Sequence, residues 1–391
     1  MKLKQVPEDF LVDELSNRQP SKSGTFSLYR LTKQSLGTPE AVDRIARAWK
    51  IPRKQISWGG LKDRHAITTQ MLTIQKGPAR DLERDGVQLE FLGLTGKPFT
   101  ASDLKGNRFC ITLRALDADR AERAVTELKT LARNGVPNYF DDQRFGSVGN
   151  SGEFVARSWI AGDYERALWL ALADPHPFDR SAEKKQKTIL RDHWGDWTTC
   201  KQELDRSHRR SVITYLCDHP TGFRKAFALI RPDMRSLYLS AYQSMLWNRC
   251  LAAELTARCR PEDLQPLTLK LGDVPCHASL PESERTALAD LNIPLPSGRM
   301  KLQPGPLRER IEAVVAEEGL TIPEVKVKFP RDCFFSRALR PALLLPRQLS
   351  GDVADDELAA GRRKLVLRFE LPPGAYATMI VKRLTALPEG S

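Results

Sequence analysis

The sequence predicts an α+β fold whose sheets are largely antiparallel. Segments with the alternating pattern of strands are interleaved with segments that have the 3.6-residue period of helices. Their order does not follow the regular strand–helix–strand rhythm that a parallel sheet requires. With 391 residues, the chain is long enough for two or three domains.

Each expected element follows from a local pattern. Strands are expected where apolar and polar residues alternate, which happens at residues 25–31, 70–75, 107–116 and 364–371. Helices are expected where apolar residues recur on one face, which happens at residues 38–52, 117–135, 237–255 and 375–387.

Two helix ends have local signals. Thr38 is a suitable cap for the first helix, and Pro39 suits its first position. Asn134 and Gly135 are expected to end the second helix, because both tolerate the left-handed backbone of a helix terminus.

The composition favours a polyanionic partner and argues against several classes of site. The net charge is +12 and the isoelectric point is near 9.4, which suits nucleic acid, although a solvated basic surface would look the same. The seven cysteines form no CxxC pair and the six histidines form no metal-ligand grouping, so we expect no metal, no cofactor and a reducing cytoplasm. No apolar run is long enough to cross a bilayer, and the first ten residues contain no apolar signal core.

The segment GGLKDRHA carries one carboxylate in a basic, glycine-opened turn. Asp63 lies between Lys62 and Arg64, two cations that would hold it ionised. An ionised carboxylate can act as a nucleophile or as an electrostatic partner. The simpler interpretation is a surface turn with a local ion pair.

The segment PNYFDDQRFG offers an amide, two rings and a guanidinium group. Asn138 could orient a carboxylate, Phe140 could stack on a base, and Arg144 could bind a phosphate. The alternative is a core plug with one satisfied amide, in which Arg144 ties the fold together.

Six segments together resemble the TruD family of pseudouridine synthases. They are KQVPEDFLVDE, GGLKDRHAITTQ, LKGNRFCITLR, GVPNYFDDQRFG, SLYLSAYQSMLWN and PPGAYATMIVKRL, in that order. The resemblance covers residues 4–157 and 235–391. It implies a pseudouridine synthase core from residues 1–157 and 341–391, with a mainly antiparallel mixed sheet flanked by helices. It further implies an inserted family-specific α/β domain from residues 158–340 and a basic cleft between two lobes.

The resemblance also implies a reaction and a set of site residues. The expected activity is isomerisation of a uridine in tRNA, at position 13 in this family, by a cytoplasmic monomer that needs no cofactor or metal. Other RNA targets stay open, as does the choice between attack at ribose C1′ and attack at the base. Asp63 matches the catalytic aspartate, supported by matches at the following positions: Asn138, Phe140, Lys4, Glu8 and Phe10. The basic residues of the same segments are candidates for RNA binding: Lys62, Arg64 and Arg144.

Two other functions compete with this one. The first is an RNA-binding protein or tRNA folding chaperone that has the fold without catalysis, which the joint presence of Asp63, Asn138 and Phe140 argues against. The second is a base-excision glycosylase, which would release free uracil. Residues 165–232 match no family segment. We expect their basic runs, EKKQK at 183–187 and RSHRR at 206–210, to grip RNA, with solvated loop charges as the alternative.

Overall fold

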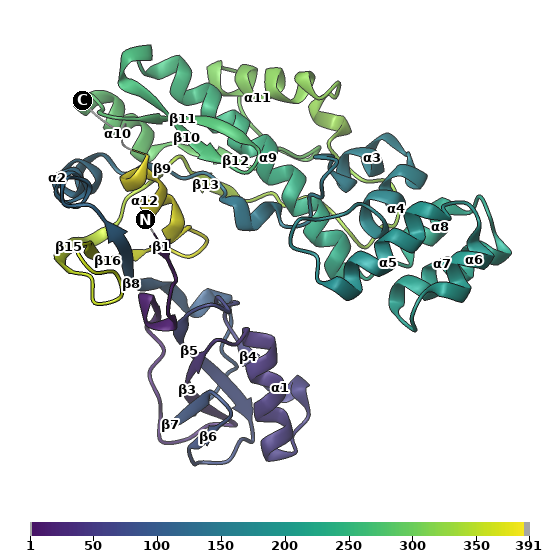
Figure 1. Ribbon diagram of the computed structural model, residues 1–391, viewed down its shortest axis with the longest axis horizontal. Coiled ribbons are helices and arrows are strands. Elements are labelled where there is room, and N and C mark those ends of the chain that lie inside the picture. Colours follow the sequence, from purple (N-terminus) through teal and green to yellow (C-terminus); the bar gives the residue numbers. More distant parts are fainter. Residues whose placement is uncertain (1, 387–391) are drawn as a thin grey trace. The chain divides into compact units, whose positions relative to one another are not determined.

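The computed structural model describes residues 2–386, which form two compact units (Figure 1). Among the described residues, unit 1 comprises residues 2–136 with 344–386, and unit 2 comprises Pro137–Leu343. The chain passes between the units at β9 (Val136–Pro137) and β14 (Leu343–Leu344). Unit 2 begins at Pro137, and the inserted domain expected at residues 158–340 stays a prediction. Asn138, Phe140 and Arg144 therefore belong to unit 2.

Unit 1 is built on one ten-stranded sheet. Only the β2–β5 pair is parallel and the other pairs are antiparallel, so the expected α+β class with a mainly antiparallel sheet is confirmed. The short strands β1 (Lys2–Leu3) and β4 (Ile56–Trp58) pair with β8 and β5. The strand order is β15 (Arg347–Asp355), β16 (Arg363–Leu371), β8 (Leu104–Leu116), β2 (Phe10–Ser16), β5 (Ile67–Gln75), β3 (Phe26–Gln34), β7 (Val87–Thr95) and β6 (Leu82–Arg84).

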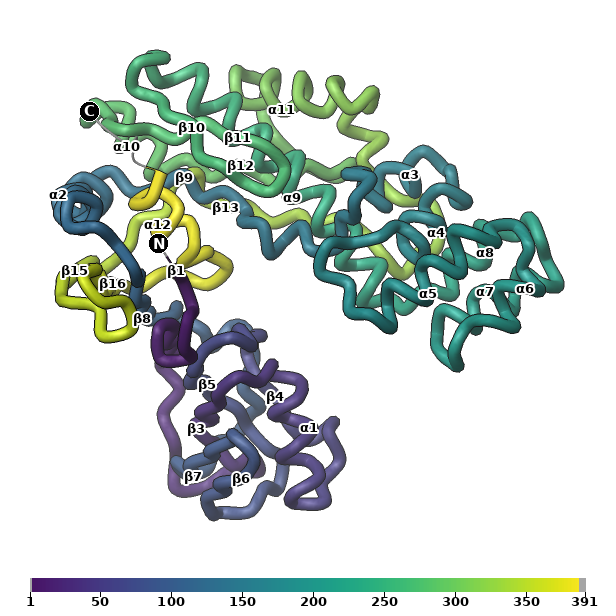
Figure 2. Tube along the Cα trace, in the orientation of Figure 1, coloured from purple at the N-terminus to yellow at the C-terminus, as the bar shows by residue number. Residues whose placement is uncertain are grey.

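Strand β8 pairs with strands from both ends of the chain. The N-terminal segment, purple in Figure 2, and the yellow C-terminal segment both pair with it, through β1, β2 and β16. The predicted inward set of β8 is buried, at Phe109, Ile111 and Leu113. The ring of Phe109 stacks on Phe369 of β16 at a centroid distance of 5.4 Å. Apolar side chains at every second position of β8 thus fix its register against the neighbouring strands.

Helices α1 (Thr38–Trp49) and α2 (Ala118–Asn134) of unit 1 pack on the sheet. Helix α1 packs its apolar face on β3, β5 and β7, with Val42 and Ile45 fully buried. The predicted cap is wrong, because Gly37 occupies the N-cap and Thr38 is already helical. Helix α2 ends at the predicted residue, and it contacts β15, β16 and α12 (Ala377–Thr385). Residue 387 of the last expected helix lies outside the described residues.

Unit 2 is organised around one long helix, α9 (Pro232–Arg258), which confirms and extends the helix expected at 237–255. It is buried on most of its circumference, so it shows little amphipathic pattern. Around it in Figure 1 lie β10 (Leu264–Leu269), β11 (Gly272–His277), α10 (Glu282–Asp290), β12 (Asn292–Pro294), α11 (Pro306–Glu317) and β13 (Leu339–Pro341).

Residues 165–232, which match none of the six segments, fold together with the residues just before them into helices that form one end of unit 2. Trp159 and Phe227 pack at a centroid distance of 4.8 Å within this group. Within residues 2–386, no helix has the length and apolar character needed to cross a membrane. The helices are α3 (Val155–Ala161), α4 (Tyr164–Leu172), α5 (Ser181–Asp192), α6 (Trp197–Glu203), α7 (His208–Asp218) and α8 (Phe223–Ala228).

Candidate active site

Asp63 lies on the loop that connects β4 to β5, and its carboxylate forms an ion pair. The Lys4 ammonium lies 3.1 Å from Asp63 Oδ2, with the two side chains 20% and 35% exposed. The same ammonium lies 3.9 Å from the centroid of the Phe10 ring. A cation between a carboxylate and a ring face is attracted by both. The structure therefore brings together three of the residues that the sequence singled out.

A buried acid that the sequence did not reveal shapes the turn that carries Lys4. Asp9 is 1% exposed, and its Oδ2 accepts hydrogen bonds from the backbone N–H groups of Gln5 (3.0 Å) and Val6 (3.1 Å). Lys4 itself adopts φ +57°, a left-handed conformation that a lysine adopts only when its surroundings impose it. Asp9 thus holds the backbone that presents the Lys4 side chain.

Asp9 is itself held by a buried ionic cluster. Arg114 of β8 donates to Asp9 Oδ1 at 2.7 Å and to Asp356 Oδ1 at 2.8 Å. Asp356 also accepts from the Ala115 N–H at 2.8 Å. Removing one partner of a buried ion pair costs about 3–5 kcal/mol, because the other charge is left without compensation. The turn around Lys4 is therefore held to strand β8 through the ion pair between Asp9 and Arg114.

A polar cradle lies beneath the Asp63 loop. The Thr38 hydroxyl accepts from the Lys62 N–H (3.0 Å) and donates to Gln70 (2.8 Å). Gln70 in turn donates to the Gly60 carbonyl at 3.1 Å. Thr38 and Gln70 are buried, so these bonds are shielded from water. Thr38 therefore anchors the loop instead of capping the helix.

Lys33 also supports the Asp63 loop through hydrogen bonds from its buried side chain. Its ammonium donates to the carbonyl oxygens of Asp63 (2.8 Å) and Leu36 (2.5 Å), and the residue is 1% exposed. Burial lowers the pKa of Lys33 to about 8, against the opposing effect of the Asp63 charge. A sequence signal was present, because Lys33 continues the inward spacing of Tyr29 and Leu31 along the strand.

The two cations beside Asp63 in the chain have other partners. The Lys62 side chain is 7% exposed, forms an ion pair with Glu14 at 2.8 Å and donates to Asn107 at 2.7 Å. Arg64 is exposed and pairs with Glu40 at 2.8 Å. Lys62 is thus buried beneath the loop, and only Arg64 of this pair is placed on the surface where a phosphate could reach it.

The glycine pair of the loop packs against its own unit. A Cβ on Gly59 would lie 2.9 Å from Leu104 and from Phe99, a distance that real side chains do not tolerate. The absence of a side chain at Gly59 therefore lets the loop approach the sheet. Glu8, the remaining candidate of unit 1, is exposed and accepts a long hydrogen bond of 3.5 Å from Gln34.

Asn138 is held within unit 2. Its Nδ2 donates to the Pro341 carbonyl (3.0 Å), and its Oδ1 accepts from Arg340 (2.7 Å). Asn138 is 4% exposed. Both polar atoms of the amide thus have partners in the chain segment that returns toward unit 1.

Phe140 is buried as well, with an exposed fraction of 6%. The Asn248 amide clamps its backbone, accepting from the N–H at 2.8 Å and donating to the carbonyl at 2.9 Å. The guanidinium of Arg340 lies 4.1 Å from the ring centroid and that of Arg144 lies 5.2 Å away. Trp247 meets the ring edge-on at 5.5 Å. This packing favours the core interpretation of Phe140 over an open stacking platform.

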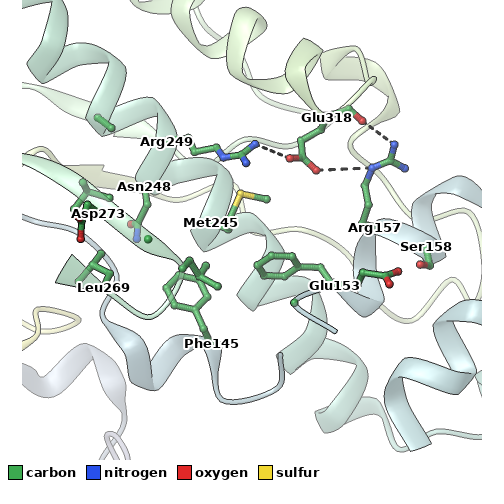
Figure 3. A pocket seen from close by; sticks show the side chains of 16 residues that line it. Phe145, Glu153, Arg157, Ser158, Met245, Asn248, Arg249, Leu269, Asp273 and Glu318 are labelled. Carbon is green, nitrogen blue, oxygen red and sulfur yellow. Dashed lines mark hydrogen bonds and ion pairs between the residues drawn. The ribbon is translucent and has the colours of Figure 1, made fainter. Parts of the chain in front are cut away.

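A cavity of about 500 Å³ lies next to this segment in unit 2 (Figure 3). Asn248 and Phe145 line it, so its wall supports the segment that carries Phe140. The Glu318 carboxylate accepts from Arg249 at 2.6 Å and lies 3.8 Å from Arg157, as the dashed lines in Figure 3 show. The charged groups of the cavity therefore largely compensate one another.

Three of the six lysines and arginines in the two basic runs of the helical end have partners within the described residues. Lys187 pairs with Asp179 at 2.9 Å, Arg209 pairs with Glu183, and Arg210 donates to the Lys201 carbonyl at 2.8 Å. Lys184 and Lys185 are exposed. Across residues 2–386, no group of three or more metal-ligating side chains occurs.

Comparison with known proteins decides the family. The family model described as tRNA pseudouridine synthase D (TruD) matches residues 1–384. The chain belongs to the TruD family. The resemblance inferred from six short segments is therefore confirmed over nearly the whole chain, including the helical end that those segments did not cover.

Individual TruD relatives span the same length. A protein of Methanococcus maripaludis named probable tRNA pseudouridine synthase D 1 is 32% identical, and the match covers 98% of this chain and 99% of that protein. A tRNA pseudouridine synthase D of Leptospira interrogans is 29% identical over 98% of this chain and 95% of its own. A TruD crystal structure from Methanosarcina mazei matches with a TM-score of 0.73 at 26% identity, covering 98% of this chain and 92% of that one.

Proposed function

We propose that this chain isomerises uridine to pseudouridine in tRNA, at position 13, with Asp63 as the catalytic carboxylate. The observation that carries the proposal is the Lys4–Asp63 ion pair on a loop held from beneath, in a chain of the TruD family. A carboxylate that must act on a nucleotide needs a fixed position and a compensating charge, and the cradle and Lys4 supply them.

The reaction is an isomerisation that consumes and releases nothing else. The bond between N1 and C1′ breaks, the uracil rotates, and C5 forms a bond to C1′; the proton that leaves C5 is balanced by one gained at N1. The Asp63 carboxylate acts either at C1′, through a covalent intermediate that C5 then displaces, or at the base. In both routes the target must leave its stack, at a cost of a few kcal/mol.

Binding of the whole tRNA is proposed to rest on phosphate contacts. The net charge of +12 suits a polyanion, and affinity for it should fall steeply with salt. Arg64 and Arg144 are proposed contacts for this RNA, and Glu8 is proposed to border the nucleotide pocket. The same proposal takes the enzyme to be a cytoplasmic monomer, in line with seven free cysteines, none of them in a disulfide.

Pseudouridine mapping with the Asp63→Asn variant tests the proposal. Wild-type protein and variant are incubated with an unmodified tRNA transcript, which is then mapped for pseudouridine and assayed for free uracil. We expect pseudouridine from the wild type only, with tRNA affinity of the variant within about tenfold, or about 1.4 kcal/mol. Turnover by the variant would show that Asp63 is not the catalytic carboxylate. A wild type that binds without modifying would support the chaperone, and released uracil would support the glycosylase.

A further inference from the structure

A second pocket of unit 2, of about 400 Å³, combines positive charge with an aromatic ring. Three cationic side chains line it, from Arg299, Lys326 and Arg331, and all three residues are exposed. Within the described part of the chain, none of these side chains has an ion pair or hydrogen-bond partner. Most other arginines of the molecule have such partners, so this group of uncompensated charges is unusual here.

The acidic side chains near this pocket are already engaged. Both oxygens of Asp332 accept from Arg235 at 2.8 Å. Glu324 accepts hydrogen bonds of 2.7 Å from the Thr321 N–H and hydroxyl. Glu324 stays charged and interacts electrostatically with Lys326, so three cations face one carboxylate without an ion-pair partner, and the pocket has a net positive potential.

A buried hydroxyl gives a second, independent sign of a ligand. Ser297 lines the same pocket and is 2% exposed. Its Oγ has no hydrogen-bond partner within residues 2–386. Buried hydroxyls are ordinarily paired, because an unpaired one costs free energy of folding. A hydrogen-bonding ligand in the pocket would supply the missing partner.

The aromatic ring at the pocket, Phe334, is exposed to solvent between two buried neighbours in the chain. Phe334 is 77% exposed, whereas the flanking Cys333 and Phe335 are 6% and 5% exposed. The buried neighbours fix the backbone, so the exposed ring needs little further ordering to bind. Single exposed apolar residues are common, and Phe178, 85% exposed, is another. The combination with three unpaired cations distinguishes Phe334.

We propose that this pocket binds one nucleotide of the RNA substrate, with its phosphate on the three cations and its base stacked on Phe334. Sequence-tolerant binding of single-stranded RNA uses this combination of cations with an exposed ring. The ring makes an acidic peptide a poorer match, because a peptide would use only the charges. The inference rests on the proposed function for the identity of the RNA, but binding at the pocket does not depend on catalysis.

Affinity measurements with matched controls test the pocket. Phe334→Ala should weaken binding of a tRNA transcript about fivefold or more, the lower end of the effect of one stacked base. Changing Arg299, Lys326 and Arg331 together to Gln should lower the slope of log affinity against log salt by about one, because the pocket is proposed to hold one phosphate. Phe178→Ala is the control for an exposed ring. Arg231→Gln is the control for a lost charge, because Arg231 is already paired with Asp233. Both controls should bind as the wild type does.

Ultraviolet cross-linking of the wild-type protein to tRNA avoids any effect of substitution on folding. Trypsin cleaves after Arg331 and Arg337, so a stacked base should leave a nucleotide on the peptide DCFFSR. Wild-type affinity and salt slope in the pocket variants, together with no nucleotide on this peptide, would overturn the proposal. Equal losses in Phe178→Ala would also count against it. Pseudouridine formation by the wild type is scored separately, so failure of the proposed function is distinguished from failure of the pocket.

Discussion

The ammonium of Lys4 lies 3.1 Å from the carboxylate of Asp63, although 59 positions separate the two residues in the chain. The cations next to Asp63 in the sequence pair elsewhere, Lys62 with Glu14 and Arg64 with Glu40. The charge that compensates Asp63 is thus supplied by the N-terminal turn. That turn is part of the same sheet, because β1 pairs with β8.

Replacing Lys4 with Met should slow pseudouridine formation at least about tenfold at saturating tRNA, because the carboxylate loses the cation that orients it. Stability should change little, since a partly exposed pair contributes about 0–1 kcal/mol. Single-turnover rates and thermal melting measure the two effects. Arg30→Met is the control, because it removes an exposed ion pair of the same unit, with Glu90, that has no proposed role in the site. Equal rates for the Lys4 variant and the wild type would contradict a role in the site.

Replacing Lys33 with Met should lower the rate of turnover, although Lys33 is proposed to support the Asp63 loop and not to contact the substrate. The variant leaves the carbonyls of Asp63 and Leu36 without their buried donor, so the loop loses its support. Hydrogen exchange of the loop amides should speed up while exchange in the rest of the sheet stays slow. Unchanged exchange with an unchanged rate would show that the loop is held without Lys33.

Lys33 also predicts a pH dependence of stability. Its pKa is about 8 in the folded chain, below the ordinary value of 10.5 expected on unfolding. Between these values the unfolded chain binds more protons, so stability should rise with pH through this window, by up to about 3 kcal/mol. Below pH 8 both states are protonated and the term is constant. Urea unfolding of the wild type and Lys33→Met from pH 7 to 10 measures it. The difference in unfolding free energy between the two proteins should change only above about pH 8. Parallel pH profiles would exclude the contribution of Lys33.

Truncating Phe140 to Ala should destabilise unit 2 by about 3–5 kcal/mol, the usual cost of emptying a buried phenylalanine site. Urea unfolding measures the loss, and Phe178→Ala is the control because its ring is 85% exposed. The sequence left two roles open for Phe140, a stacking ring and a core plug. Normal stability with a large loss of single-turnover rate would restore the stacking role.

The basic runs of the helical end should separate into two classes. Changing Arg209 to Gln should mainly lower stability, because its guanidinium is bound to Glu183. Changing Lys184 and Lys185 together to Gln should leave stability unchanged, since both are exposed. If the helical end contacts RNA, the double variant alone should lower the salt slope of tRNA binding, by at most about 1.5. A slope equal to that of the wild type would place the RNA grip elsewhere.

Much of the fold was predictable because its signals are local. The inward set Phe109, Ile111 and Leu113 needs only the two-residue period of a strand, and the end of α2 needs only Asn134 and the following glycine. The Thr38 cap failed because a hydroxyl binds whichever partner the tertiary structure offers. Here the hydroxyl accepts from the Lys62 N–H and donates to Gln70.

The sequence by itself determined the family, the α+β class and the loop that carries Asp63, because motifs and periodicity are properties of short segments. Only the tertiary structure decided which charges meet. It paired Asp63 with Lys4, placed Lys33 beneath the loop, turned Lys62 inward and left the cations around Phe334 without partners within residues 2–386. The physical reason is that an ion pair forms between groups that are neighbours in space, and strand order sets those neighbours. No local pattern encodes that β1 lies beside β8.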